Sequence, residues 1–258
     1  MAPRDVILTV YACSYAAPCN QWAKEFFEDE PIVLNVPGSG GASFRAKAVA
    51  WGKTGDLFKA AVKELAPHLG DVEIGRRGLV TFSVGWAFAD ELLKFEKEKN
   101  RLDAYLLLDG CHTNDLTNWQ DYAIRCANLE AFMAMAHSSI KPPFVSTTVT
   151  NSTMFKKACD ANEHNMSVPK LTFDPPDYVI QAILPTPVTI KLGASPGMKA
   201  SSKTWTTDPL IKFENRGDLT RIHYSGEGPC DHVYVSWYVS KRLWQWLGES
   251  WRNPYKDL

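Results

Sequence analysis

Ser83 stands where an apolar strand would pass directly into a helix. The segment GLVTFSVGW, residues 78–86, has an apolar run before the serine and Gly85 two residues after it. A nucleophile elbow needs this order, because a sharp strand-to-helix turn lifts the serine oxygen above the sheet and small neighbours let strand and helix approach. Thr81 occupies the position where the usual pattern has glycine. The junction predicts a nucleophilic Ser83, and the alternative is an ordinary strand–turn–helix junction with Ser83 as the N-cap.

Asp109 and His232 are candidates for the acid and the general base that a nucleophilic Ser83 would need. A serine nucleophile needs a general base, and the base needs an orienting acid. Asp109 ends the apolar run DAYLLLD, and His232 follows an apolar segment and the loop GEGPCD. Both residues fall after strands, as Ser83 does, so we expect the three to share one sheet edge. A turn or capping role for Asp109 and a structural role for His232 are the alternatives.

The elements that must position these residues alternate along the first half of the chain. We expect strands at 5–11, 32–36, 78–82, 103–108 and 143–149, and helices at 20–29 (with Asn20 as a cap), 54–66, 86–98 and 118–137. Such alternation predicts an α/β fold with a mostly parallel sheet. Open sheets of this kind bind ligands at the carboxyl ends of their strands.

Residues 160–218 break this alternation and hold seven prolines. We interpret them as an insertion or cap with some extended segments and a small hairpin. A last core strand is expected at 219–226, followed by an aromatic amphipathic helix at 233–247. The chain is therefore expected to be a single domain, residues 1–258, with a cap at about 160–218.

Composition narrows the function classes. The chain has 258 residues, 45% of them hydrophobic, and 28 Lys+Arg against 29 Asp+Glu give a net charge of -1. The hydrophobic content excludes global disorder, and the balanced charge argues against a nucleic-acid or acidic-membrane partner. The sequence contains no window of ~18 consecutive apolar residues, so we expect no membrane span.

The N-terminus and the cysteines bear on location and metal binding. The apolar run VILTVYA is short and directly follows Asp5, which is unlike a signal peptide. We therefore expect a protein that is cytoplasmic or released without a classical signal peptide. The six cysteines show no CxxC pair and no metal-ligand spacing, so we expect reduced thiols and no metal or other cofactor, with a disulfide between distant cysteines left open.

The order of strand-Ser-helix, strand-Asp and strand-loop-His-helix resembles that of the α/β-hydrolase superfamily, serine esterase and lipase type. The resemblance covers most of the chain except about 160–218, and the short start before the serine is similar to that of cutinases and phage mycolyl-arabinogalactan esterases. It implies a three-layer α/β/α sandwich, with Ser83 as the nucleophile and His232 as the general base. It also implies oxyanion donors at Val84 and in the loop around Cys13 and Ser14.

The resemblance leaves two positions for the acid. Many relatives place it after the strand expected at 143–149, where this chain has Thr150, Asn151 and Ser152. Some lipases place it one strand earlier, which here is Asp109. Asp115 and Asp160 are the reserve candidates.

Three residues are candidates for contact with the substrate. Most tryptophans are expected to pack in the core, but Trp86 adjoins the elbow and Trp205 lies in the insertion. His112 lies close to Asp109 in sequence and could line the site.

The leading expectation is a serine hydrolase that cleaves a lipid-like or polysaccharide-linked carboxylic ester through an acyl-enzyme. An amide or thioester hydrolase, or a non-catalytic binding module on the same scaffold, are the alternatives. The substrate would be a small molecule or a polymer, and the oligomeric state stays open.

Overall fold

The computed structural model describes residues 2–11, 19–95, 100–110, 122, 125–126, 130–138, 178–179, 188–194, 199–206, 210–216, 219–224 and 227–252, with the backbone alone for 178–179, 210–216 and 219–224. The strands are β1 Arg4–Tyr11, β2 Ile32–Asn35, β3 Ile74–Phe82, β4 Ala104–Leu108, β5 Phe132–His137, β6 Tyr178–Val179, β7 Val188–Leu192, β8 Ser201–Trp205, β9 Leu210–Arg216 and β10 Leu219–Tyr224. The helices are α1 Cys19–Phe26, α2 Gly41–Gly52, α3 Leu57–Leu65, α4 Trp86–Lys94, α7 Pro229–Tyr234 and α8 Ser240–Arg252. A π-helical turn, Val235–Val239, joins α7 to α8, and 3-10 turns lie at Pro67–Leu69 and Ser83–Gly85.

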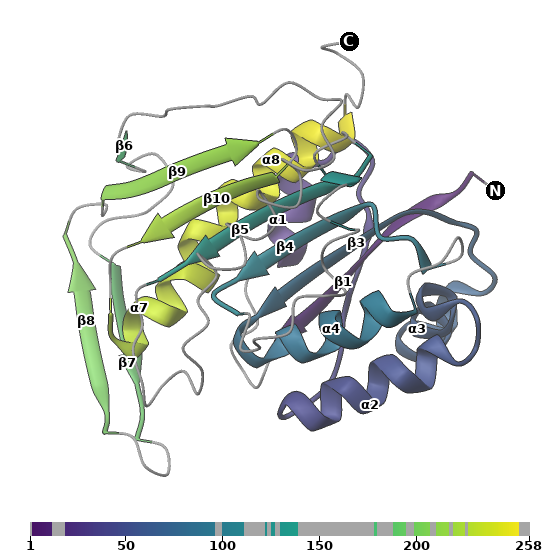
Figure 1. The fold of residues 1–258 in the computed structure, drawn as a ribbon, viewed down its shortest axis with the longest axis horizontal. Helices are drawn as coiled ribbons and strands as arrows, with labels where there is room; N and C mark the ends of the chain where they lie inside the picture. The colour runs from purple at the N-terminus through teal and green to yellow at the C-terminus, as the bar shows by residue number, and fades with distance from the viewer. Residues whose placement is uncertain are drawn as a thin grey trace.

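A mostly parallel sheet forms the centre of the molecule (Figure 1). Its strand order is β2-β1-β3-β4-β5-β10-β9-β6, and the strands from β2 to β10 in that order all pair in parallel. Strand β9 pairs antiparallel with β10 and β6 antiparallel with β9. The expected α/β class and mostly parallel sheet are therefore confirmed.

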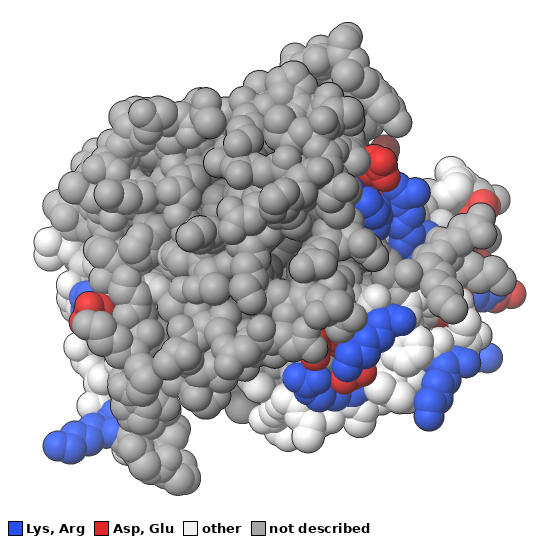
Figure 2. Space-filling view, viewed as in Figure 1, with Lys and Arg blue, Asp and Glu red and all other residues white. Residues whose placement is uncertain are grey.

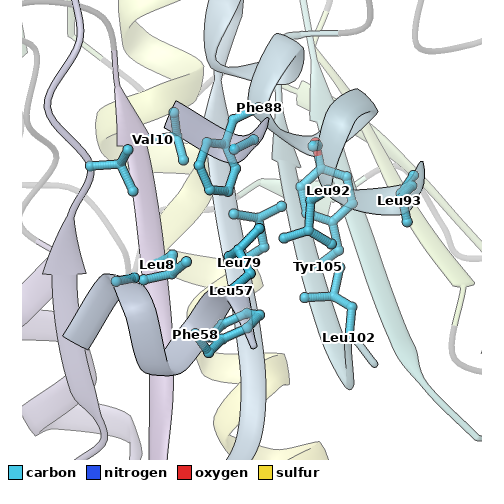
Figure 3. Packing of buried hydrophobic residues seen from close by; sticks show 14 of the residues in the cluster. Leu8, Val10, Leu57, Phe58, Leu79, Phe88, Leu92, Leu93, Leu102 and Tyr105 are labelled. Atoms are coloured by element: carbon cyan, nitrogen blue, oxygen red, sulfur yellow. The ribbon is translucent and has the colours of Figure 1, made fainter. Parts of the chain in front are cut away.

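Both faces of the sheet are covered by apolar side chains. Along β1, Val6, Leu8 and Val10 join one core cluster, whereas Ile7 joins the other, as the alternation of side chains along a strand requires. Helices α2, α3 and α4 contribute side chains that pack on the strands in the first cluster. Helices α1, α7 and α8 do the same in the second. Figure 3 shows Phe88 and Leu92 of α4 above the strand residues of the first cluster.

The helix expected at 118–137 is wrong in its last part, because Phe132–His137 is strand β5. Its residues alternate between the two clusters, with Met133 and Met135 on one face and Ala134 and Ala136 on the other. A strand buried on both faces has a continuous apolar sequence without period-2 polarity. Alanine and methionine are also good helix formers, which favoured the wrong element.

Helix α2, Gly41–Gly52, was not expected. Its buried residues Phe44, Ala48 and Trp51 follow helical spacing. Alanines elsewhere around the helix blur that stripe in the sequence, and the preceding glycines indicated a loop.

The residues between about 160 and 218 do contain extended segments. Strands β7 and β8 form a separate two-stranded antiparallel hairpin, as expected. Strands β9 and β6 instead extend the main sheet. The closing helical segment begins at Pro229 rather than at 233, which places His232 inside α7. The strand expected at 143–149 lies outside the described residues.

Described charged residues of both signs lie side by side on the face shown in Figure 2. Opposite charges also pair at Arg45, whose guanidinium is 2.7 Å from the carboxylate of Asp90 and 3.1 Å from that of Glu91. Across the described ranges, no helix is both long enough and apolar enough to cross a membrane.

Candidate active site

Ser83 follows the last residue of β3 in a left-handed backbone conformation, with φ of 51°. Residues other than glycine avoid this region, so a serine there is held against a local conformational preference. The 3-10 turn Ser83–Gly85 leads directly into α4. The chain thus makes the sharp strand-to-helix bend that the sequence predicted at this position, and Ser83 stays partly exposed.

Gly85 lets this bend pack against β1. A Cβ atom added at Gly85 would collide with the backbone carbonyl oxygen of Val10. Only glycine allows so close an approach, which gives the physical reason for the small residue two positions after the serine. On the other side of Ser83, Thr81 is fully buried and its hydroxyl lies 2.5 Å from the Tyr105 hydroxyl. The threonine at the usual glycine position is thus accommodated by a hydrogen bond to β4.

Asp109 lies at the matching place on the neighbouring strand. Phe82 and Leu108 are partners in the β3–β4 register, so Ser83 and Asp109 each come one residue after the same rung of the sheet. Asp109 also has a positive φ, 43°, and is 4% exposed. A Cβ added at Gly110 would lie 3.0 Å from the Ser83 carbonyl oxygen, which shows how closely the two turns approach.

His232 contacts Asp109 directly. Its Nδ1 atom lies 2.6 Å from Asp109 Oδ2, across 123 positions of sequence. An ionised carboxylate can only accept hydrogen bonds, so Nδ1 carries a proton, and whenever the ring is neutral the lone pair is therefore on Nε2. This is the tautomer that a general base needs.

The environment keeps Asp109 ionised. Burial by itself raises the pKa of the carboxyl group, but the charge of His232 and hydrogen bonds from His232 and Ser138 outweigh burial and lower the pKa below its usual value of 3.8. A carboxylate that is buried yet charged must be well supplied with donors. The geometry around Asp109 meets that requirement.

Phe82 connects the histidine with the elbow. The His232 ring packs against the Phe82 ring at a centroid distance of 4.5 Å, with the two planes tilted by 34°, and Phe82 directly precedes Ser83. The His232 side chain is 17% exposed, so part of it is open to solvent. Between these described residues no direct hydrogen bond joins the Ser83 hydroxyl to His232. Hydrogen bonds of this kind are often long in the absence of substrate and shorten in the Michaelis complex.

Ser138 is the one site residue in this group that the sequence did not indicate. It directly follows β5, and both its backbone N–H (2.9 Å) and its hydroxyl donate to Asp109. The helix expected at 118–137 conceals this residue, because it leaves no strand end before position 138. With β5 recognised as a strand, Ser138 would have appeared as a polar residue at the same sheet edge.

The expected oxyanion donors are described only in part. Val84 follows Ser83, is partly exposed, and its Cγ2 lies near Gly41 at the start of α2. Cys13 and Ser14 lie outside the described residues. Just before them, the hydroxyl of Tyr11 accepts a hydrogen bond from Cys19 Sγ at 3.6 Å, and burial raises the pKa of the Cys19 thiol to about 12. Cys19 therefore stays protonated at neutral pH and does not compete as a nucleophile.

Trp86 and Trp205, the two tryptophans expected near the substrate, both have buried rings. Trp86 is 2% exposed and packs in the cluster under α4, and Trp205 is 7% exposed and stacks on Tyr234 at 4.4 Å. Both rings therefore pack the fold, and their contact with a substrate stays a prediction. His112, Asp115 and Asp160 lie outside the described residues.

Metal binding finds no support in the described ranges, where no group of three or more His, Cys, Asp or Glu side chains is placed to hold an ion. Cys19 and Cys230 are buried thiols. What the arrangement offers is instead a serine hydroxyl on a strained turn, with a carboxylate-oriented imidazole beside it.

Neither a known protein family nor a curated protein matches this chain.

Proposed function

We propose that the protein is a serine hydrolase that cleaves carboxylic esters through an acyl-enzyme intermediate. The observation that carries this proposal is the 2.6 Å contact between a buried Asp109 carboxylate and His232 Nδ1, one strand away from a serine held at positive φ. Burial, tautomer control and backbone strain at adjacent strand ends are typical of nucleophilic catalysis. The same features support an α/β-hydrolase assignment, in which helices on both faces of the sheet make a three-layer α/β/α sandwich.

In this mechanism the Ser83 hydroxyl attacks the ester carbonyl carbon while His232 Nε2 takes its proton. The carbonyl oxygen becomes an oxyanion, which the Val84 backbone N–H at the start of the helical turn would stabilise. His232 then gives the proton to the leaving alkoxide, and the acyl group stays on Ser83. Water, deprotonated by His232, attacks the acyl-enzyme and releases the carboxylic acid, with Ser83 regaining its proton.

Asp109 has two tasks in this cycle. It holds the imidazole in the tautomer with a free Nε2, and its charge stabilises the imidazolium that forms at each proton transfer. The hydrogen bonds from Ser138 keep that carboxylate ionised and fixed in place.

A fluorophosphonate probe and a p-nitrophenyl ester test the assignment together. We expect the wild-type protein to hydrolyse the ester and to be labelled at Ser83, and we expect Ser83→Ala to lose both while keeping its circular dichroism spectrum. Ser202→Ala is the matched control, because Ser202 is an exposed serine in β8. Equal hydrolysis by wild type and Ser83→Ala would refute the proposal.

The missing hydrogen bond between Ser83 and His232 favours one competing function, a non-catalytic binding module. The same labelling experiment separates the two, since a binding module leaves Ser83 unlabelled. Given labelling, a panel of acyl esters, thioesters and amides with short and long acyl chains determines the bond type. A lipid-like ester predicts rates that rise with chain length, whereas a polysaccharide-linked acyl group predicts a preference for short acyl sugars.

A further inference from the structure

The β7–β8 hairpin touches the helix that carries His232 at two successive residues. Lys203 Nζ of β8 lies 2.5 Å from Asp231 Oδ1, and the Cys230 thiol donates to the Ile190 carbonyl of β7 at 3.6 Å. The hairpin is not part of the main sheet. In Figure 1 it lies beside α7, at the edge toward which the arrowheads of β4, β5 and β10 point. Both contacts fall immediately before the proposed general base.

Asp231 is the centre of this junction. Its side chain is 4% exposed, whereas that of Lys203 is 43% exposed, so a half-exposed cation neutralises a buried anion. The other carboxylate oxygen, Oδ2, accepts the backbone N–H of Gly228 at 2.9 Å. One carboxylate therefore ties the hairpin to the first turn of α7.

The first turn of α7 in turn sets the backbone of His232. The Gly228 carbonyl oxygen accepts the backbone N–H groups of Asp231 at 3.0 Å and of His232 at 3.2 Å. Together with the Gly228-to-Asp231 bond, this is a reciprocal capping arrangement that fixes where the helix begins. A continuous set of contacts thus leads from Lys203 through Asp231 and Gly228 to His232, whose ring contacts Asp109.

We propose that Lys203 is a positioning residue for the hydrolytic reaction: by pairing with buried Asp231 it fixes the first turn of α7 and so holds the His232 ring on Asp109. The inference rests on the proposed function, in which His232 is the general base. Removing Lys203 takes a cation away from a buried carboxylate, and a structure relieves such a loss by exposing the charge to water. Here the segment that would have to move is the turn that carries the base. The β7–β8 hairpin is then part of the catalytic assembly, in addition to any contact it makes with substrate.

Lys203→Met, with the hydrolysis of a p-nitrophenyl ester as the readout, tests this directly. We expect kcat to fall at least about ten-fold with KM nearly unchanged, because a misplaced base affects proton transfer more than binding. Lys191→Met is the matched control, since Lys191 is an exposed lysine on the same hairpin. It should keep the wild-type kcat.

A second pair of variants separates positioning from a loss of general stability. Lys203→Arg keeps the cation and should stay within a few-fold of wild type. The double variant Lys203→Met/Asp231→Asn should recover most of the lost kcat, because a neutral amide oxygen can still accept the Gly228 N–H but needs no cation. Wild-type kcat in Lys203→Met, or a double variant no better than that single variant, would overturn the inference.

The NMR signal of the His232 Nδ1 proton provides a readout that does not depend on turnover. In the wild type this proton is bonded to Asp109, and we expect its deshielded resonance to weaken or vanish in Lys203→Met but not in Lys191→Met. If the wild type proves inactive while this loss occurs, the proposed function fails and the positioning role stands. If the wild type is active and neither kcat nor the resonance changes in Lys203→Met, the positioning role alone fails.

Discussion

Asp109 and His232 are joined by a 2.6 Å contact although 123 positions separate them in the sequence. The parallel sheet makes this contact possible. Strands β4 and β10 lie on either side of β5 and run in the same direction, so both end at the same edge of the sheet. The turn after β4 presents Asp109, and the chain after β10 returns through α7 to present His232. The fold thus brings together a carboxylate and an imidazole from distant parts of the chain.

Replacing Asp109 with asparagine should reduce kcat for ester hydrolysis by about 10³–10⁴-fold. The amide can donate as well as accept, so it no longer selects the His232 tautomer with the proton on Nδ1. Initial rates with a p-nitrophenyl ester would measure the loss, with Asp29→Asn as a control at an exposed carboxylate. Retention of more than about a tenth of the wild-type kcat would point to another acid.

The stability of the protein toward acid should also depend on Asp109. Burial raises the pKa of this carboxyl group, but His232 and Ser138 lower the pKa by more than burial raises it. The folded pKa therefore lies below the usual 3.8. A group whose pKa is depressed by folding contributes stability above 3.8, and the contribution is lost as the pH falls through the folded value. As the pH falls from 3.8 toward the folded value, the wild-type protein should lose free energy of unfolding more steeply than Asp109→Asn, by up to about 1.4 kcal/mol per pH unit. Urea unfolding between about pH 6 and pH 2 would measure both slopes, and equal slopes would show that Asp109 titrates alike in the folded and unfolded chains.

Much of the site was predictable because three strands carry strong local signals. Strands β1, β3 and β4 are buried apolar runs, and Ser83 and Asp109 come directly after two of them. The sequence pointed to His232 because it comes after the last parallel strand, although it lies inside α7 rather than before the closing helix. These are properties of short segments, which a sequence displays directly.

The parts that were missed depend on contacts between segments. Strand β5 is buried on both faces, so its sequence lacks the alternation that would distinguish it from a helix, and Ser138 was hidden with it. The burial of Trp86 and Trp205 likewise depends on distant segments, because Trp86 belongs to the first core cluster and Trp205 to the second. The pair between Lys203 and Asp231 joins residues 28 positions apart, on elements whose approach no local pattern indicates.

Ser138→Ala should weaken the support of Asp109 without removing the carboxylate. The variant loses the hydroxyl donor but keeps the backbone N–H at 2.9 Å. A hydrogen bond to a charged group contributes about 1.5–3 kcal/mol, so we expect a comparable loss in the free energy of unfolding. We also expect kcat to fall about ten-fold, a change worth about 1.4 kcal/mol. Ser138→Thr keeps the hydroxyl and should restore kcat more than stability, because its extra methyl group must fit a position that is 8% exposed. If alanine and threonine give the same kcat, the hydroxyl has no part in orienting the acid.

The backbone strain at Ser83 predicts that glycine at this position stabilises the fold relative to alanine, although neither variant can hydrolyse the ester. With φ of 51°, every residue that has a Cβ atom is disfavoured there, whereas glycine is not. Ser83→Gly and Ser83→Ala should both be inactive, yet the glycine variant should be the more stable of the two by about 1 kcal/mol. The same pair of substitutions at Ser202, inside strand β8, is the control and should give the opposite order, because glycine weakens a strand interior. Thermal or urea unfolding of the four variants measures both differences. If the alanine variant is the more stable one at both positions, the bend at Ser83 stores no strain. The positive φ would then no longer support Ser83 as a nucleophile.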